Sequence, residues 1–139
     1  MLLLDTNVIS ELRKVNTGKA DIHFAHWSKQ LIISQLYISS ITIMELEIGI
    51  LQKSRHDIQQ GKTLRHWFEQ QVLPAFNGRI IAIDTSIALA CARLHIPDPR
   101  AERDALIAAT ALTHGLTLVT RNVKDFVATG VVMINPWEG

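Results

Sequence analysis

Several residues and motifs that carry common kinds of chemistry are scarce or missing from this sequence. Cys91 is the only cysteine among 139 residues. A single thiol forms neither an intramolecular disulfide nor a cysteine-based zinc site, which suits a reducing cytosol. There is no phosphate-binding glycine loop, dinucleotide fingerprint or HExxH motif. Disulfide scaffolds, zinc proteases of that type and proteins built on these nucleotide motifs are therefore excluded.

Long apolar runs and a strong charge of one sign are also missing. No uninterrupted apolar stretch approaches the roughly 18 residues of a membrane span, and the N-terminus lacks the features of a signal peptide. The 14 lysines and arginines nearly balance the 13 acids, which gives a formal net charge of +1. This balance provides no global attraction to nucleic acid or membranes, so any nucleic-acid contact must be local or metal-mediated. We expect a cytoplasmic protein with no membrane partner.

Apolar residues, in contrast, are plentiful, at 47% of the chain. The length is typical of one domain and is sufficient for a real core. No repeat, low-complexity tract or linker divides the sequence, so residues 1–139 are predicted to form a single domain. The high apolar content indicates a face that is reserved for a protein partner.

Short apolar segments alternate with segments of helical periodicity. Strands are expected near residues 1–4, 36–39, 79–83, 117–120 and 131–134, and helices near 7–14, 20–30, 41–52, 55–72, 85–94 and 101–114. This alternation predicts an α/β fold with a mostly parallel central sheet and helices on both faces. Segment 55–72 is expected to be an outer helix or hairpin arm that meets a partner. Sites in such folds lie at the carboxyl ends of strands.

Acidic residues occur at the edges of four apolar segments: Asp5, Glu45, Asp104 and Asp125. A carboxylate in such surroundings is costly unless a positive charge compensates it. No matching set of buried lysines or arginines is apparent in the sequence. A divalent metal held by oxygen ligands would supply the missing charge.

Each of these acids also has a purely structural interpretation. Asp5 could be a helix N-cap, and Glu45 follows Thr42 in the spacing of a capping box. Asp104 would favour the dipole at the start of a helix, and Asp125 is an ordinary turn residue. The occurrence of all four in one α/β pattern favours a shared site.

The helix near residues 41–51 gives the strongest individual signal. It is apolar almost all round, but Thr42, Glu45 and Gly49 share one narrow polar stripe. A glutamate beside small residues has room for an ion and a substrate. By comparison, His23 and His26 lack a third zinc ligand and are expected at the surface or the edge of the core.

Five segments together carry a family resemblance: LLDTNVISEL at 3–12, SITIMEL at 40–46 with Gly49, RDALIAATA at 103–111, LVTRNVKDF at 118–126 and VMINPW at 132–137. In this order they resemble the PIN-domain ribonucleases, and more narrowly the VapC-type toxins of bacterial toxin–antitoxin pairs. The resemblance spans nearly the whole chain. The linker at residues 97–100 departs from many relatives because it contains two prolines and no glycine, which affects the expected shape of the substrate groove.

The resemblance implies a metal-dependent endoribonuclease that uses Mg²⁺ or Mn²⁺. The implied site comprises the metal-binding acids Asp5, Glu45 and Asp104, the more variable acid Asp125, and the supporting polar residues Thr6 and Asn122. Arg121 or Lys124 could contact a phosphate group, although both could equally be solvated surface residues. The resemblance also implies a cognate antitoxin, a homodimer, and binding to promoter DNA only through the antitoxin.

Two other functions remain open from the sequence. The first is a catalytically inert PIN-like module that binds an antitoxin, with its acids kept for structural reasons. The second is an aspartyl-phosphate protein of the receiver or phosphatase kind, because Asp5 follows a first strand. That second possibility is weakened by Asn7, which stands where a phosphatase would carry its second aspartate.

Overall fold

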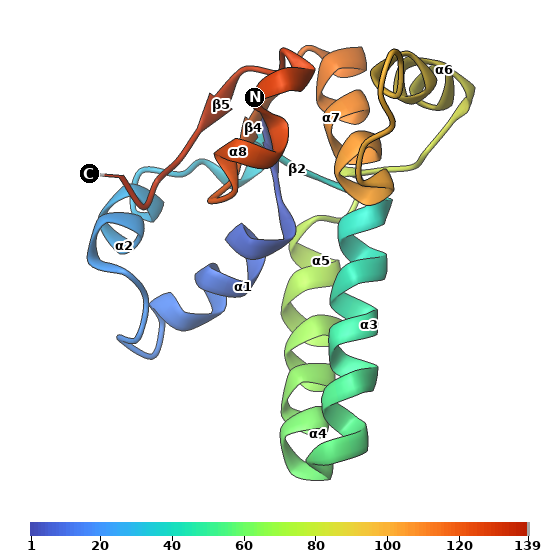
Figure 1. The fold of residues 1–139 in the computed structure, drawn as a ribbon. Helices are drawn as coiled ribbons and strands as arrows, with labels where there is room; N and C mark the ends of the chain where they lie inside the picture. The colour runs from blue at the N-terminus through green and yellow to red at the C-terminus, as the bar shows by residue number, and fades with distance from the viewer. Residues whose placement is uncertain (139) are drawn as a thin grey trace.

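The computed structural model describes residues 1–138, which contain a five-stranded sheet (Figure 1). Its strands are β1 (Leu2–Leu4), β2 (Leu36–Ser39), β3 (Ile80–Ile81), β4 (Thr117–Val119) and β5 (Met133–Ile134). Their spatial order is β3-β2-β1-β4-β5, and each printed pairing is parallel. The predicted parallel α/β sheet is confirmed, and the first strand of the chain lies at its centre.

Helices cover both faces of the sheet, as predicted. Successive residues of a strand point to opposite faces. Leu4 packs in one core cluster with Val8 and Phe24, whereas Leu3 packs in another with Ile107 and Phe126. The principal helices are α1 (Thr6–Val15), α2 (Ile22–Ser28), α3 (Ser40–His56), α4 (Ile58–Trp67), α6 (Thr85–Leu94), α7 (Glu102–His114) and α8 (Val123–Phe126).

Aspartates and a glycine mark the ends of several of these helices. The Asp84 carboxylate accepts the backbone N–H of Ile87 and caps α6. Gly115 ends α7 with a φ of 65°, in the left-handed region that glycine adopts without steric cost. The Asp57 carboxylate caps α4 by accepting the N–H of Gln60.

The helical segment near Pro74 differs from expectation, because it continues beyond the proline. A π-helical turn (η2, Phe68–Val72) follows α4 and leads directly into α5 (Leu73–Ala75). Helical conformation is unbroken through Val72 and Leu73, and the segment ends at Ala75. The helix therefore runs one residue past Pro74 before it stops.

Helices α3 and α4 form a hairpin that projects from the sheet (Figure 1). The Arg65 guanidinium joins them by donating to both carboxylate oxygens of Glu47, at 2.5 and 2.7 Å. Gly61 permits close packing, since a Cβ at this position would lie 2.7 Å from the Cα of Ser54. The predicted hairpin arm is present, and its contact with a partner stays a prediction.

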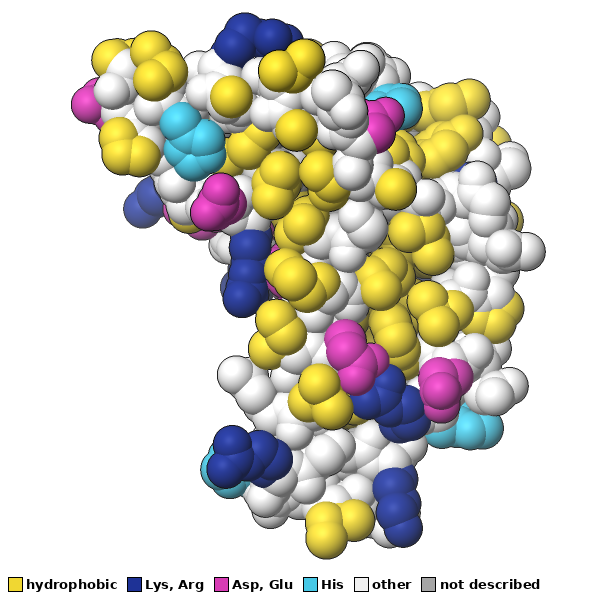
Figure 2. Space-filling model, turned by 90° about the vertical axis from the view of Figure 1, so that its right-hand side faces the viewer, with side chains coloured by type: hydrophobic (Ala, Val, Ile, Leu, Met, Phe, Trp, Pro, Cys, Tyr) yellow, Lys and Arg dark blue, Asp and Glu magenta, His cyan; other side chains and the backbone are white. Residues whose placement is uncertain are grey.

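Apolar side chains form a band across the face that Figure 2 presents. This is the side on which α3, α6 and α7 lie in Figure 1. Exposed large apolar residues on these helices include Met44, Leu51, Leu89 and Leu112. The band is consistent with the predicted partner face. Within residues 1–138, no helix combines the length and the apolar character that a membrane crossing requires.

Candidate active site at the carboxyl edge of the sheet

Asp5 follows β1 directly and is 5% exposed. Its Oδ1 atom accepts the backbone N–H of Thr6 at 2.8 Å, which caps α1. Its Oδ2 atom accepts the Thr120 hydroxyl at 2.8 Å and the Asn7 side-chain amide at 3.2 Å. Burial raises the pKa of Asp5, and the negative charge of Glu45 raises it further. The hydrogen bonds just described lower this pKa, but the net shift is upward. Asp5 is therefore a cap and also a member of a buried polar cluster.

Glu45 projects from α3 toward the same cluster. Its Oε1 atom accepts the Thr6 hydroxyl at 2.6 Å, and its Oε2 atom lies 3.8 Å from Nη1 of Arg103. The capping-box interpretation is wrong, because Ser39 caps α3 by accepting the N–H of Ile41. The side chain of Glu45 thus contacts residues of α1 and α7 and does not cap its own helix.

Asp104 and Asp125 complete the acidic edge. Asp104 lies in the first turn of α7 and is partly buried, whereas Asp125 lies in α8 and is exposed. Burial, followed by repulsion from Asp5, Asp125 and Glu45, raises the pKa of Asp104 from 3.8 to about 6. All three of the other acids therefore lie close enough to Asp104 for their charges to act on it.

The predicted supporting and phosphate-binding residues also lie near this edge. Thr6 contacts Glu45, as described, and the backbone N–H of Asn122 donates to the Thr120 hydroxyl at 3.0 Å. The guanidinium of Arg121 lies 5.5 Å from the centre of the Trp137 ring, so this arginine packs on an aromatic face. Lys124 is exposed.

Three contacts of the cluster were missed by sequence reasoning. Thr120 and Asn7 both donate to Asp5, and Arg103 pairs with Glu45. Thr120 follows β4 as Asp5 follows β1, so the rule that sites form at strand ends could have identified it. Arg103 directly precedes Asp104, but nothing in the sequence shows which acid it contacts.

The donor atoms suit a hard divalent cation, because carboxylate and hydroxyl oxygens are its preferred ligands. A cation would also relieve the repulsion that acts on Asp104. Within residues 1–138, no group of three or more His, Cys, Asp or Glu side chains is positioned to hold a metal ion. The kinds of oxygen atom in the cluster thus suit a cation. The positions of the side chains in the structure, however, do not form a ligand set.

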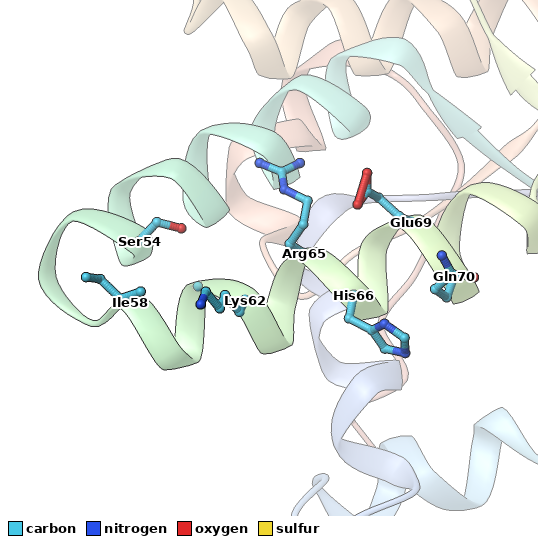
Figure 3. A pocket seen from close by; sticks show the side chains of 8 residues that line it. Ser54, Ile58, Lys62, Arg65, His66, Glu69 and Gln70 are labelled. Carbon is cyan, nitrogen blue, oxygen red and sulfur yellow. The ribbon is translucent and has the colours of Figure 1, made fainter.

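A cavity of about 230 Å³ lies beside Glu45; Thr6, Ser10, Gly49, Lys53 and Trp67 also line it. A hollow of about 480 Å³ is lined by Gly49, Gln52, Lys53, Arg55 and His56. Figure 3 shows a third cavity, of about 440 Å³, which lies between the end of α3 and α4 and includes Lys62 and His66 in its lining. None of the four acids lines this third cavity.

Comparison with known proteins gives matches along nearly the whole chain. A family model described as PIN domain matches residues 2–131. VapC ribonuclease Y4jK of Sinorhizobium fredii is 36% identical over 146 residues, which cover 99% of each chain. Toxin FitB of Neisseria gonorrhoeae is likewise 36% identical over 146 residues, with 99% of each chain covered.

Solved structures agree with these sequence matches. The crystal structure of FitAcB from Neisseria gonorrhoeae has a TM-score of 0.89 at 35% identity and covers 100% of both chains. The structure of FitAB bound to a DNA fragment has a TM-score of 0.85 at 33% identity, with 100% of this chain and 97% of that one covered. A toxin–antitoxin complex from Klebsiella pneumoniae has a TM-score of 0.67 at 31% identity, over 100% of both chains.

Proposed function

Because this chain belongs to the PIN domain family, we propose that it is a metal-dependent endoribonuclease that acts as the toxin of a toxin–antitoxin pair. The observation that carries this proposal is the gathering of Asp5, Glu45, Asp104 and Asp125 at one sheet edge. Full-length relatives named as a ribonuclease and a toxin support it. The aspartyl-phosphate alternative receives no support from the family match.

In this proposal Asp5, Glu45 and Asp104 would hold a divalent cation, Mg²⁺ or Mn²⁺, by reorienting from the positions in which they form no ligand set, and Asp125 would orient water or help to hold a second ion. The chemistry that such a cation would supply is neutralisation of phosphate oxygens and a lowered pKa of bound water. The chain itself contributes rigidity, because Thr120, Asn7 and the Thr6 N–H fix the Asp5 carboxylate.

The remaining polar residues orient the acids and meet the substrate. The Thr6 hydroxyl holds one oxygen of Glu45, while Arg103 offsets the charge on the other. Asn122 supports the cluster through its backbone contact with Thr120. Arg121 and Lys124 are the proposed phosphate contacts of this edge, since cations beside the site reduce its repulsion of RNA.

The test is cleavage of purified cellular RNA by the parent chain and by Asp104→Asn, with Mn²⁺ or with EDTA. We expect the substitution to reduce the rate by more than about 100-fold, because removal of even an outer partner of a metal ligand costs roughly 10–100-fold. Asp98→Asn is the matched control, since Asp98 is exposed and lies outside the cluster. Cleavage that persists in EDTA, or at the parent rate in Asp104→Asn, would refute the assignment.

The inert-module alternative makes a different thermodynamic prediction. A module whose acids are only structural has no saturable affinity for Mg²⁺ or Mn²⁺. Calorimetric titration of the parent chain and Asp5→Asn separates the two functions. Saturable binding that is lost in the variant supports the nuclease, while its absence from the parent chain supports the inert module.

We also propose a protein antitoxin as the principal partner. Toxin–antitoxin complexes among the matched structures and the exposed apolar band both support this partner. By the same resemblance the chain forms a homodimer and reaches promoter DNA only through the antitoxin. Gel filtration of the lone chain tests the homodimer, and a strict monomer at all concentrations would contradict it. Cytoplasmic localisation stays a prediction.

A further inference from the structure

One face of α3 connects the acidic edge to the free end of the hairpin. Glu45, Gly49 and Lys53 are spaced four residues apart, which places them above one another on one helix face. All three line the cavity beside Glu45, and Gly49 and Lys53 also line the neighbouring hollow. We call Gly49, Lys53, Arg55 and His56 the basic track. From Glu45 to Lys53, a separation of eight residues, the helix rises about 12 Å. The basic track therefore starts about one helical turn from Glu45 and extends away from the acids.

The end of the hairpin is locally positive in a chain that is almost neutral. Residues 53–66 contain four of the 14 lysines and arginines but only one of the 13 acids. Figure 2 shows Lys and Arg side chains around this end. Arg65 is held by Glu47, but among residues 1–138 no carboxylate lies within 4.0 Å of the charged nitrogens of Lys53 or Arg55. The two cations are exposed and have no ionic partner of their own in this part of the chain.

Gly49 leaves the track open between the acids and Lys53. It is exposed, and a Cβ added there would have no atom within 4 Å. Packing therefore does not require glycine, although glycine inside a helix costs about 0.5–1 kcal/mol relative to alanine. An uncovered strip of helix backbone allows a bulky chain to lie close to α3.

We propose that the basic track binds the phosphate backbone of single-stranded RNA on one side of the bond to be cleaved. This inference rests on the proposed nuclease function and adds a substrate path to it. Four carboxylates repel RNA at the reacting centre, and cations farther along the strand restore affinity without occupying that centre. Phosphate contacts of this kind fix the register of the strand and carry no sequence information.

The first experiment measures binding without cleavage. A labelled single-stranded RNA of about 12 nucleotides, within the usual range of such sites, is titrated in EDTA at several salt concentrations. We expect Lys53→Gln to weaken binding about fivefold at 0.1 M salt and to reduce the salt slope by about 0.7, the value for one lost phosphate contact. Lys29→Gln removes the same charge from an exposed position at the end of α2 and should change neither quantity.

The second experiment tests the open path itself. Gly49→Leu should fill the track and weaken RNA binding, while Gly49→Ala should retain it. Circular dichroism confirms that both variants are folded. Equal RNA binding by Lys53→Gln and Lys29→Gln, or by the two Gly49 variants, would overturn the proposal.

Cleavage assays separate this inference from the function on which it rests. The small phosphodiester bis(p-nitrophenyl) phosphate needs only the acidic centre, whereas long RNA also needs the track. We expect Lys53→Gln to lose kcat/KM for long RNA and to keep the parent value for the small ester. If the parent chain hydrolyses neither, the proposed function fails, and the binding assays still decide whether the track holds RNA. A labelled acidic peptide serves as the competing ligand. If Lys53→Gln loses binding of this peptide but keeps the parent's RNA binding, the track binds a protein and not RNA.

Discussion

The two carboxylate oxygens of Asp5 have different partners. One accepts a hydrogen bond from the backbone N–H of Thr6, which begins α1. The other accepts hydrogen bonds from the Thr120 hydroxyl and the Asn7 side-chain amide. The structural and functional interpretations of this residue therefore do not exclude each other. The first strand, the first helix and the cluster all depend on one side chain, so a change at Asp5 affects stability as well as the site.

The raised pKa of Asp104 has a consequence for stability. Its carboxyl has a pKa of about 6 in the folded chain against an ordinary value of 3.8, so the folded state binds the proton more tightly. Stability contributed by this proton is present at low pH and is lost as the pH rises from about 4 through 6.

We therefore expect Asp104→Asn to raise Tm at pH 7 in EDTA, because it removes a charge that burial disfavours and that the neighbouring acids repel. The gain should shrink toward zero as the pH falls to about 4, where the parent carboxyl is also neutral. Thermal unfolding followed by circular dichroism across this range is the measurement. Asp98→Asn should show no such trend, and a gain independent of pH would contradict the electrostatic explanation.

The sequence selects the four acids as candidates, and their role in the site stays a prediction, but it does not place their partners. Asp5 and Asp125 were found because they follow strands, and Glu45 because its helix is otherwise apolar. The contact between Arg103 and Glu45 joins side chains of two helices. Its existence depends on how α7 packs against α3, and local sequence patterns contain no such information.

Helices were more predictable from the sequence than the short edge strands. Asp84 and Gly115 set the ends of α6 and α7 where local chemistry requires. Strands β3 and β5 are shorter than the segments expected at 79–83 and 131–134. Both lie at the edges of the sheet, where only one neighbour supplies hydrogen bonds, so β propensity alone overstated their length.

The hairpin provides a matched pair of glycine substitutions. A Cβ at Gly61 would lie 2.2 Å from Oγ and 2.7 Å from Cα of Ser54, whereas one at Gly49 would meet nothing within 4 Å. We expect Gly61→Ala to lower the free energy of unfolding by about 1–3 kcal/mol through overpacking. Gly49→Ala should raise it by about 0.5–1 kcal/mol. Urea denaturation measures both, and equal effects would show that α3 and α4 are not so closely packed.

The whole sheet was only partly predictable. Alternating elements indicated parallel strands, and all four pairings are parallel. The order β3-β2-β1-β4-β5 was not predicted, because it depends on contacts between residues far apart in the sequence. The periodicity of the apolar residues predicts only an α/β fold with a mostly parallel sheet. The family resemblance is more specific, because it predicts the PIN domain.

The single-domain organisation of residues 1–139 stays a prediction, and unfolding can test it. Trp67 lies on the hairpin and packs against the main core cluster, while Trp27 and Trp137 contact Phe24 beside the sheet. If the chain is one cooperative unit, fluorescence of the parent and of Trp67→Phe should give the same urea midpoint as circular dichroism. An earlier transition that disappears in Trp67→Phe would instead show that the hairpin unfolds independently.

The hydrogen bond between Thr120 and Asp5 joins positions 115 residues apart. A ribosome adds Asp5 near the beginning of synthesis, but Thr120 and Asp125 follow only after most of the polypeptide has emerged. A nascent chain accordingly carries its central strand without the β4 neighbour and its first acid without the last. An incomplete translation product lacks Thr120 and Asp125, so a nascent chain cannot assemble the proposed site until its own synthesis is nearly finished.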